Sequence, residues 1–353
     1  MKVFLFYFSL TCLLCLATSF SHFNNNLTPA TSLETIDQIN SSQNLWTAGV
    51  NNKFKEASID DAKVLLGTFL LSEEDFQKSV PMKTFYDEEL TALPTNYDPR
   101  DAYPNCSSIK EIRDQSTCGS CWAFAAAEVM SDRICIHSQQ KLQTRVSSEY
   151  ILTCCDSCGF GCDGGWPQKA FAYWNENGIV SGGLYGDYKT CQPYVFPPCE
   201  HHTTGKYEPC GPSKPTPACQ QKCNSSYKTP FEDDKSFGTN YGIPKNESSI
   251  MKEIYTYGPV SAAFTVYDDF LLYKTGIYIK TSSKALGGHA VKIIGWGEEN
   301  GTKYWLVVNS WNEDWGDKGL FKIRRGTNEC GIESNIVAGV PKDSDMVLLF
   351  LGL

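Results

Sequence analysis

The chain has 353 residues, a formal net charge of -9 and a sequence pI near 5.2. Nucleic-acid binding depends on clustered Lys and Arg, so we expect no nucleic acid among the partners of this acidic chain. The length allows a two-layer or two-domain body plus a further segment, and no internal repeat is present.

Residues 1–21 have the composition of a secretory signal peptide. A basic start at Lys2 is followed by an apolar run, Val3 to Leu16, and then by small residues. The run is too short to span a membrane, and so is the apolar end of the C-terminal tail, residues 342–353. The sequence therefore predicts entry into the secretory pathway, a lysosomal or extracellular location, and no membrane anchor.

Cysteine is unusually frequent, with 16 in the chain. Cys12 and Cys15 lie in the signal peptide, and all others fall between Cys106 and Cys330. In a secreted chain this density predicts disulfides. N-x-S/T sequons agree with a glycoprotein; they lie at Asn26, Asn40, Asn105, Asn224, Asn246 and Asn300.

Residues 22–92 contain no cysteine, which marks a domain boundary. The segment is either a removable propeptide or a small docking domain made of short helices and linker. If the chain is a peptidase, a cover is needed during transport, which favours a propeptide cut near Ala92 and Leu93 and a mature domain over residues 93–341.

Apolar residues after Cys121 recur at i, i+3, i+4, i+7 and i+8, which predicts a helix that begins at or just before Cys121. Residues 154–223 are rich in Cys, Gly and Pro and are expected to form loops. Short β-branched or aromatic runs predict strands at 263–267, 276–279, 290–294, 304–308 and 320–323.

A cysteine at a helix N-terminus is a candidate nucleophile. The helix dipole and unpaired N–H groups lower its pKa, and the thiolate is the reactive species. Gln115, six residues before Cys121, supplies an amide donor that, together with the Cys121 N–H, could stabilise an oxyanion.

His289 and Asn309 flank a hairpin signal, Asn300-Gly301. Folding about this turn brings the imidazole at the start of one strand toward the carboxamide at the end of the next. An Asn acceptor would fix the histidine tautomer and direct the other ring nitrogen at a thiol.

Two other interpretations remain open for the cysteines. Cys118 and Cys121 fit a C-x-x-C redox pair, but no thioredoxin-like context accompanies them. A zinc site could use cysteines of one cluster, Cys154, Cys155, Cys158 and Cys162, although disulfides are favoured in an oxidising compartment. We expect no cofactor and no metal.

The motif C-G-S-C-W around Cys121, with Gly287-Gly288-His289-Ala290 and Asn309-Ser310-Trp311 downstream, resembles the papain-like cysteine peptidases, and within that family the cathepsin B group. The resemblance covers residues 93–341. It implies an α+β fold of two domains, a helical left domain and a β-barrel-like right domain, with the active-site cleft between them.

The same resemblance implies roles for individual residues. Cys121 and His289 form the thiolate–imidazolium pair, Asn309 orients the histidine, and Gln115 completes the oxyanion hole. Gly164 and Gly165 bind the substrate backbone, and further residues line the cleft and its second subsite: Trp166, Pro167, Ala263, Ala290, Trp311 and Asn335. Protein and peptide substrates, the chain's own propeptide and cystatin-type inhibitors are the implied partners.

An insertion over residues 191–223 resembles the occluding loop of the cathepsin B group. His201 and His202 would receive a substrate's C-terminal carboxylate and give dipeptidyl carboxypeptidase activity beside endopeptidase activity. Asp114 matches the tether of the first histidine.

Three positions depart from the group's pattern. Tyr207 stands where a second tether, paired with Asp314, would use arginine; Asp163 replaces an asparagine; and Asn335 replaces a pocket glutamate.

The resemblance also implies six disulfides and leaves Cys330 free. The implied pairs are Cys106–Cys135, Cys118–Cys162, Cys154–Cys219, Cys155–Cys158, Cys191–Cys223 and Cys199–Cys210. The rival functions are a binding protein on the same scaffold and a disulfide-rich adhesion module. The presence of Cys121 with His289, Asn309 and Gln115 favours the enzyme.

Overall fold

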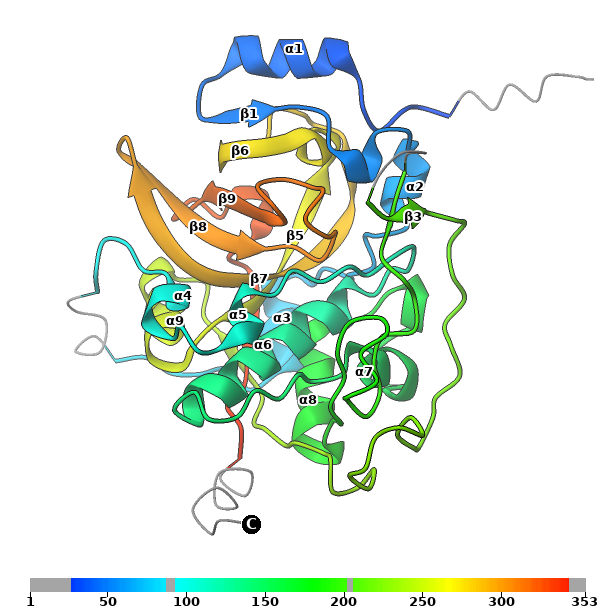
Figure 1. Cartoon of the computed structure of the whole chain (residues 1–353). Helices are drawn as coiled ribbons and strands as arrows, with labels where there is room; N and C mark the ends of the chain where they lie inside the picture. Colours follow the sequence, from blue (N-terminus) through cyan, green and yellow to red (C-terminus); the bar gives the residue numbers. More distant parts are fainter. Residues whose placement is uncertain (1–26, 87–92, 202–205, 343–353) are drawn as a thin grey trace, which may run out of the picture.

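The computed structural model describes residues 27–86, 93–201 and 206–342 (Figure 1). The predicted signal peptide, Ala92, His202 and most of the predicted C-terminal tail lie outside the described residues. Among the described residues, no helix has the length and apolar character needed to cross a membrane.

In chain order, a mixed N-terminal segment is followed by a helical half and then by a half composed mainly of strands. The N-terminal segment contains α1 (Leu33–Ser42), β1 (Trp46–Ala48), η1 (Asn52–Phe54), α2 (Ile59–Lys63) and α3 (Glu73–Ser79). The helical half follows with α4 (Pro99–Ala102), α5 (Ser107–Lys110), α6 (Cys121–His137), α7 (Ser148–Cys154), η3 (Gly161–Asp163) and α8 (Pro167–Asn177). The rest comprises β2 (Cys199–Glu200), β3 (Glu208–Pro209), β4 (Tyr241–Ile243), α9 (Glu247–Tyr257), β5 (Val260–Tyr267), η4 (Asp268–Leu272), β6 (Tyr273–Tyr278), β7 (Ala285–Glu299), β8 (Thr302–Val308), β9 (Leu320–Arg324), η5 (Glu329–Gly331) and β10 (Asn335–Ala338).

The larger sheet has the order β1-β6-β9-β8-β7-β5-β10-β4, and β2 pairs with β3 apart from it. At Asn300-Gly301 both residues have positive φ, as a two-residue hairpin turn requires, and β7 pairs antiparallel with β8 across it. His289 lies inside β7, not at a strand start as the sequence predicted, because β7 extends back to Ala285.

Two separate hydrophobic cores hold the molecule together. One fills the strand-rich half around Phe270, Trp305 and Phe321 and includes Trp46 of the N-terminal segment. The other lies among α6, α7 and α8 around Trp122 and Trp174. The predicted α+β class with a helical and a strand-rich domain is confirmed, and Figure 1 shows the two halves meeting along α6 and β7.

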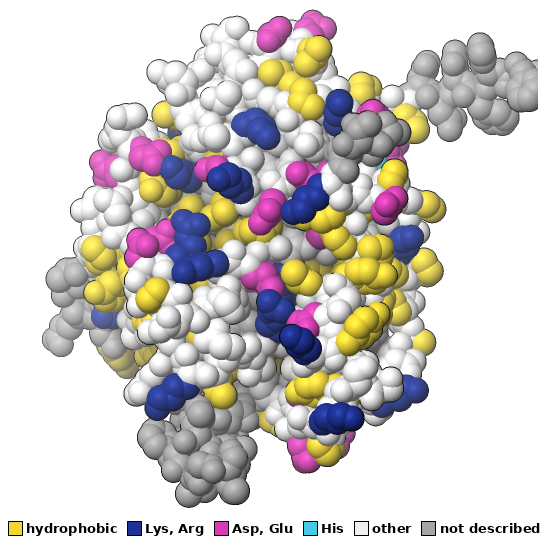
Figure 2. Space-filling model, in the orientation of Figure 1, with side chains coloured by type: hydrophobic (Ala, Val, Ile, Leu, Met, Phe, Trp, Pro, Cys, Tyr) yellow, Lys and Arg dark blue, Asp and Glu magenta, His cyan; other side chains and the backbone are white. Residues whose placement is uncertain are grey.

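The N-terminal segment is built onto the strand-rich half. β1 adds to the sheet edge by pairing antiparallel with β6, and α1 lies over it (Figure 1). The Ser58 capping box starts α2, with the Ser58 hydroxyl and the Asp61 carboxylate each bonding the other residue's backbone N–H. Figure 2 shows Lys and Arg side chains interspersed with Asp and Glu on this face of the molecule.

Candidate active site

Cys121 is the first residue of α6, as the sequence predicted. The N-cap, Ser120, makes no side-chain hydrogen bond to the first turn, which leaves the positive end of the helix directed at the cysteine. Cys121 Sγ is buried and shares a hydrogen bond of 3.1 Å with Thr68 Oγ1. Burial raises the pKa of the thiol, and the hydrogen bond from Thr68 offsets part of that rise. In this covered state the sulfur is therefore a neutral thiol.

His289 and Asn309 meet as the hairpin argument predicted. His289 Nε2 donates to Asn309 Oδ1 at 2.8 Å, and the same oxygen accepts from Ser310 N, which fixes the amide orientation. Trp311 covers the imidazole with its ring centroid at 4.7 Å. Ala290, next to His289, packs against Cys121 and Ala125 and so brings β7 to the start of α6.

Burial lowers the pKa of His289 to about 4, although the bond to Asn309 favours the charged ring. Nδ1 makes no hydrogen bond within the described part of the chain. The ring is thus neutral and held by one nitrogen, with the second nitrogen available for proton transfer.

Gln115 is completely buried, and its side-chain carbonyl accepts from Ser310 Oγ at 2.8 Å. Its Nε2 donates to two carbonyls, Cys118 O at 2.8 Å and Leu65 O at 3.0 Å. The donor that the sequence singled out for an oxyanion therefore binds a backbone carbonyl of the N-terminal segment.

Residues 65–71 run across this group of side chains, and Gly67 and Thr68 form isolated β-bridges with Gly288 and Gly165. Thr68 N donates to Gly288 O at 3.1 Å, and Gly165 bonds Gly67 O at 2.8 Å and Phe69 N at 3.1 Å. The side chain of Asn335 bonds both backbone groups of Leu71. The cleft is thus able to hold an extended peptide by its backbone.

Side-chain positions along the cleft follow from the sheet register. Ala263 of β5 pairs with Ala290 of β7 on one side and with Asn335 of β10 on the other, so the three lie in a row. Trp166 and Pro167 start α8 on the opposite domain. Gly164 borders the path of the segment, since a Cβ there would meet the Phe69 ring.

Phe160 is a cleft residue that the sequence reasoning missed. It is 65% exposed, and its ring lies 6.0 Å from the ring of Phe69, which also contacts Trp166 at 4.9 Å. Its position directly before the Gly-Cys-Asp-Gly-Gly run, which contains the predicted substrate-binding glycines, could have indicated this role.

Asp114 differs from the expectation of a histidine tether. Its carboxylate accepts from Lys53 Nζ at 3.0 Å and from Asn312 Nδ2 at 2.7 Å, while His201 is not among its partners. His201 lies beside Lys53 and Asp61, and burial lowers its pKa. The physical reason is that Lys53 of the N-terminal segment already forms a buried ion pair with this carboxylate.

The cysteines resolve the alternative interpretations. The six disulfides join the pairs that the resemblance implied, with Cys118 bonded to Cys162, so Cys118 and Cys121 are not a redox pair. The zinc candidates are all in disulfides. Among the described residues one other group has metal-ligand spacing, Cys191, Cys223 and Asp234, but its cysteines are bonded to each other and offer no thiolate.

Comparison with known proteins decides the family. Residues 93–340 match the family described as papain family cysteine protease.

The chain belongs to the papain family.

Among papain-family relatives it is 49% identical over 299 residues to a cathepsin B-like cysteine proteinase of Schistosoma japonicum, covering 84% of this chain and 86% of that protein. It is 48% identical over 315 residues to cathepsin B-like cysteine proteinase 6 of Caenorhabditis elegans, covering 87% and 82%. It is thus a cathepsin B-like cysteine protease.

Among solved structures, proCathepsin B S9 from Trypanosoma congolense superposes with a TM-score of 0.77 at 38% identity, covering 89% of this chain and all of that one. Digestive procathepsin L2 of Tenebrio molitor superposes with a TM-score of 0.65 at 27% identity, covering 88% and 89%. Both solved structures are of proforms, which supports a propeptide in this chain.

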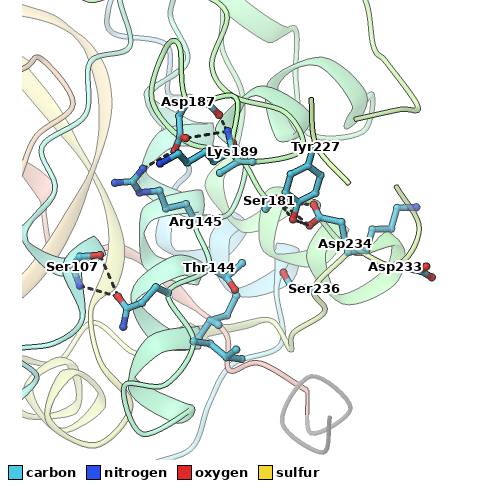
Figure 3. Close-up of a pocket in the computed structure, with 15 residues that line it drawn as sticks. Ser107, Thr144, Arg145, Ser181, Asp187, Lys189, Tyr227, Asp233, Asp234 and Ser236 are labelled. Atoms are coloured by element: carbon cyan, nitrogen blue, oxygen red, sulfur yellow. Dashed lines mark hydrogen bonds and ion pairs between the residues drawn. The ribbon is translucent and has the colours of Figure 1, made fainter. Parts of the chain in front are cut away.

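A second, open cavity lies away from the papain-type cleft (Figure 3). Arg145 pairs with Asp187 at 2.7 Å, and Asp234 accepts hydrogen bonds from the hydroxyls of Tyr227 and Ser181. These polar groups are bonded within the cavity wall, as in a structural cluster.

Proposed function

We propose that the chain is the zymogen of a peptidase that cleaves internal peptide bonds and also removes C-terminal dipeptides. The observation that carries the proposal is the path of segment 65–71, in which Thr68 contacts Cys121 Sγ and the backbone of residues 67–69 bonds Gly165 and Gly288. A peptide substrate requires the same backbone recognition and the same access to the sulfur.

The proposed reaction uses four side chains. With the cleft open, Cys121 passes its proton to His289, and Sγ attacks the scissile carbonyl carbon. The electron pair moves to the carbonyl oxygen, where Gln115 Nε2 and the Cys121 N–H donate to it. His289 then protonates the leaving amine as the C–N bond breaks, which leaves an acyl-enzyme.

Water completes the cycle. His289 takes a proton from water as the hydroxide adds to the acyl carbon, and the tetrahedral intermediate expels the Cys121 thiolate with the carboxylic acid product. Asn309 holds the ring in the required tautomer throughout, and Trp311 keeps water from that hydrogen bond.

The exopeptidase part of the proposal rests on resemblance to the cathepsin B group. His201 and His202 would bind the terminal carboxylate of a substrate as donors, cationic at acidic pH. The insertion 191–223 would limit the cleft to two residues beyond the scissile bond.

Processing and location complete the proposal. Residues 1–21 act as a signal peptide and residues 22–92 as a propeptide that inhibits until it is cut near Ala92 and Leu93. The mature domain 93–341 works at acidic pH in lysosomes or outside the cell, where cystatin-type proteins would inhibit it.

The test is activity of the acid-processed protein between pH 4 and 8. We expect hydrolysis of an internally quenched peptide and of a dipeptidyl substrate with a free C-terminus, and loss of both in Cys121→Ser. A thiol-directed epoxide should label the processed wild type at Cys121. Absence of both labelling and hydrolysis would instead favour a binding protein on this scaffold.

A further inference from the structure

A buried ammonium group joins the N-terminal segment to Asp114, the sequence neighbour of Gln115. Lys53, in η1, has no exposed surface. Its Nζ donates to Asp114 Oδ1 at 3.0 Å, to Asp114 Oδ2 at 3.2 Å and to Cys199 O at 2.8 Å. Three acceptors satisfy the three N–H bonds of the ammonium.

The acceptor side is organised by residues outside the segment. Asp114 also accepts from Ser116 N at 2.7 Å, Cys199 N at 3.2 Å and Asn312 Nδ2 at 2.7 Å. These bonds hold the carboxylate in place through the disulfide-bonded Cys199 and through the loop after β8. Residues outside the N-terminal segment thus orient the carboxylate that accepts from Lys53.

The segment also pairs with the chain beside this site. His201 N donates to Lys53 O at 3.2 Å, and Glu56 N donates to His201 O at 3.0 Å. Leu65 lies twelve residues after Lys53, and its carbonyl oxygen accepts from the side-chain amide of Gln115, the neighbour of Asp114. The two ends of this stretch therefore bind adjacent residues of the domain.

We propose that Asp114 and the Cys199 carbonyl form a binding site for a lysine ammonium, and that Lys53 is the ligand that keeps the N-terminal segment across the cleft. The proposal rests on the proposed function in that it assigns the segment an inhibitory role. Removing one member of a buried ion pair is strongly destabilising, because the remaining charge stays buried without a counter-ion. Loss of Lys53 therefore frees the residues that follow it.

The experiment measures opening of the segment without using activity. Full-length Cys121→Ser protein, which cannot process itself through Cys121, is followed by hydrogen exchange at the amides of Thr68 and Phe69, which donate to Gly288 and Gly165. Lys53→Met should make both amides exchange at least tenfold faster than in the parent. Lys55→Met is the matched control, since Lys55 is exposed two residues away, and should leave exchange unchanged.

The amides of β8 report whether the domain itself stays folded. Equal exchange at Thr68 and Phe69 in Lys53→Met and Lys55→Met would overturn the proposal. If Lys53→Met also accelerates β8, the double variant Lys53→Met with Asp114→Asn decides, because it removes the unpaired charge. If the β8 amides of the double variant return to the slow exchange of the parent while Thr68 still exchanges fast, the role of Lys53 as anchor is supported. If both the β8 amides and Thr68 return to slow exchange, that role is refuted. Inactivity of the acid-processed wild type would refute the proposed function and leave this result untouched.

Discussion

Thr68 Oγ1 lies 3.1 Å from Cys121 Sγ, so a hydroxyl of the N-terminal segment occupies the space that a scissile carbonyl would need. The same segment buries the sulfur and the imidazole, which raises the pKa of Cys121 and lowers the pKa of His289. The N-terminal segment therefore has two effects: it excludes substrate, and by burying Cys121 and His289 it disfavours the thiolate–imidazolium pair that peptide hydrolysis needs.

Acid should open the segment. The pKa of His289 is about 4 when covered, against an ordinary value of 6.5. The contribution of His289 to the stability of the covered state is complete above pH 6.5. It is lost as pH falls toward 4, because the opened state binds the proton on His289 and the covered state does not. The total loss is about 3 kcal/mol. In full-length Cys121→Ser, exchange of the Thr68 amide, corrected for intrinsic rate, should rise between pH 7 and 4.5. His289→Gln should remove most of that rise, and an equal rise in both proteins would contradict the assignment.

Gly67→Ala should expel the segment by steric overlap. A Cβ at Gly67 would collide with the backbone of Gly119, which cannot move away because Gly119 N donates to Cys162 O. We expect epoxide labelling of Cys121 in the uncleaved chain to become at least tenfold faster, measured by intact mass. Gln77→Ala, an exposed change on α3, is the control and should label like the wild type.

Glu128 should make the protein less stable at neutral pH. Burial raises its pKa to about 7, against the attraction of Lys292 and Arg113, and Lys292 Nζ lies closer to Asp132 than to Glu128, at 2.8 and 3.9 Å. The contribution of protonated Glu128 to the free energy of unfolding is complete below pH 4.5. It is lost as pH rises to 7, which costs about 3 kcal/mol of stability. Urea unfolding of full-length Cys121→Ser should show Glu128→Gln gaining stability over its parent at pH 7.5 but not at pH 4.5. A constant difference at both pH values would count against this.

Asn335 should select against arginine in the second subsite. It lies in the row with Ala263 and Ala290, and it offers an amide where a carboxylate would pair with a guanidinium. Asn335→Glu should raise the ratio of Arg-Arg to Phe-Arg substrate hydrolysis by about tenfold. Asn335→Gln is the neutral control, and equal changes for both substrates would refute the assignment.

Tyr207 should set the balance between internal and C-terminal cleavage. Tyr207 N donates to Glu200 Oε1, and Lys206 beside it reaches Glu313 at 3.7 Å in an exposed ion pair, which contributes little to holding this end of the insertion. Tyr207→Arg introduces a guanidinium intended to pair with Asp314, whose charge acts on the neighbouring Lys206. This variant should increase dipeptidyl release relative to internal cleavage severalfold. Tyr207→Phe serves as control, and an unchanged ratio in Tyr207→Arg would be evidence against the idea.

Some of the fold was predictable because its signals are local. The helix at Cys121 and the Asn300-Gly301 hairpin each depend on residues within a few positions of one another, and both occur as expected. β1 gave no signal, since three residues form a strand only because β6 offers an edge to pair with. The sequence predicts His289 at a strand start, but the pairing of β7 with β5 extends the strand back to Ala285.

The sequence by itself determined which chemical groups the protein carries and how the nearest of them meet: a cysteine at a helix start, and a histidine and an asparagine on either side of a tight turn. Only the tertiary structure decided which groups far apart in the sequence bind each other. The carboxylate of Asp114 suits an imidazole or an ammonium equally well, and the folded N-terminal segment brings Lys53 to it rather than His201. Burial and long-range backbone pairing make that choice, and both depend on the whole chain rather than on any short stretch of it.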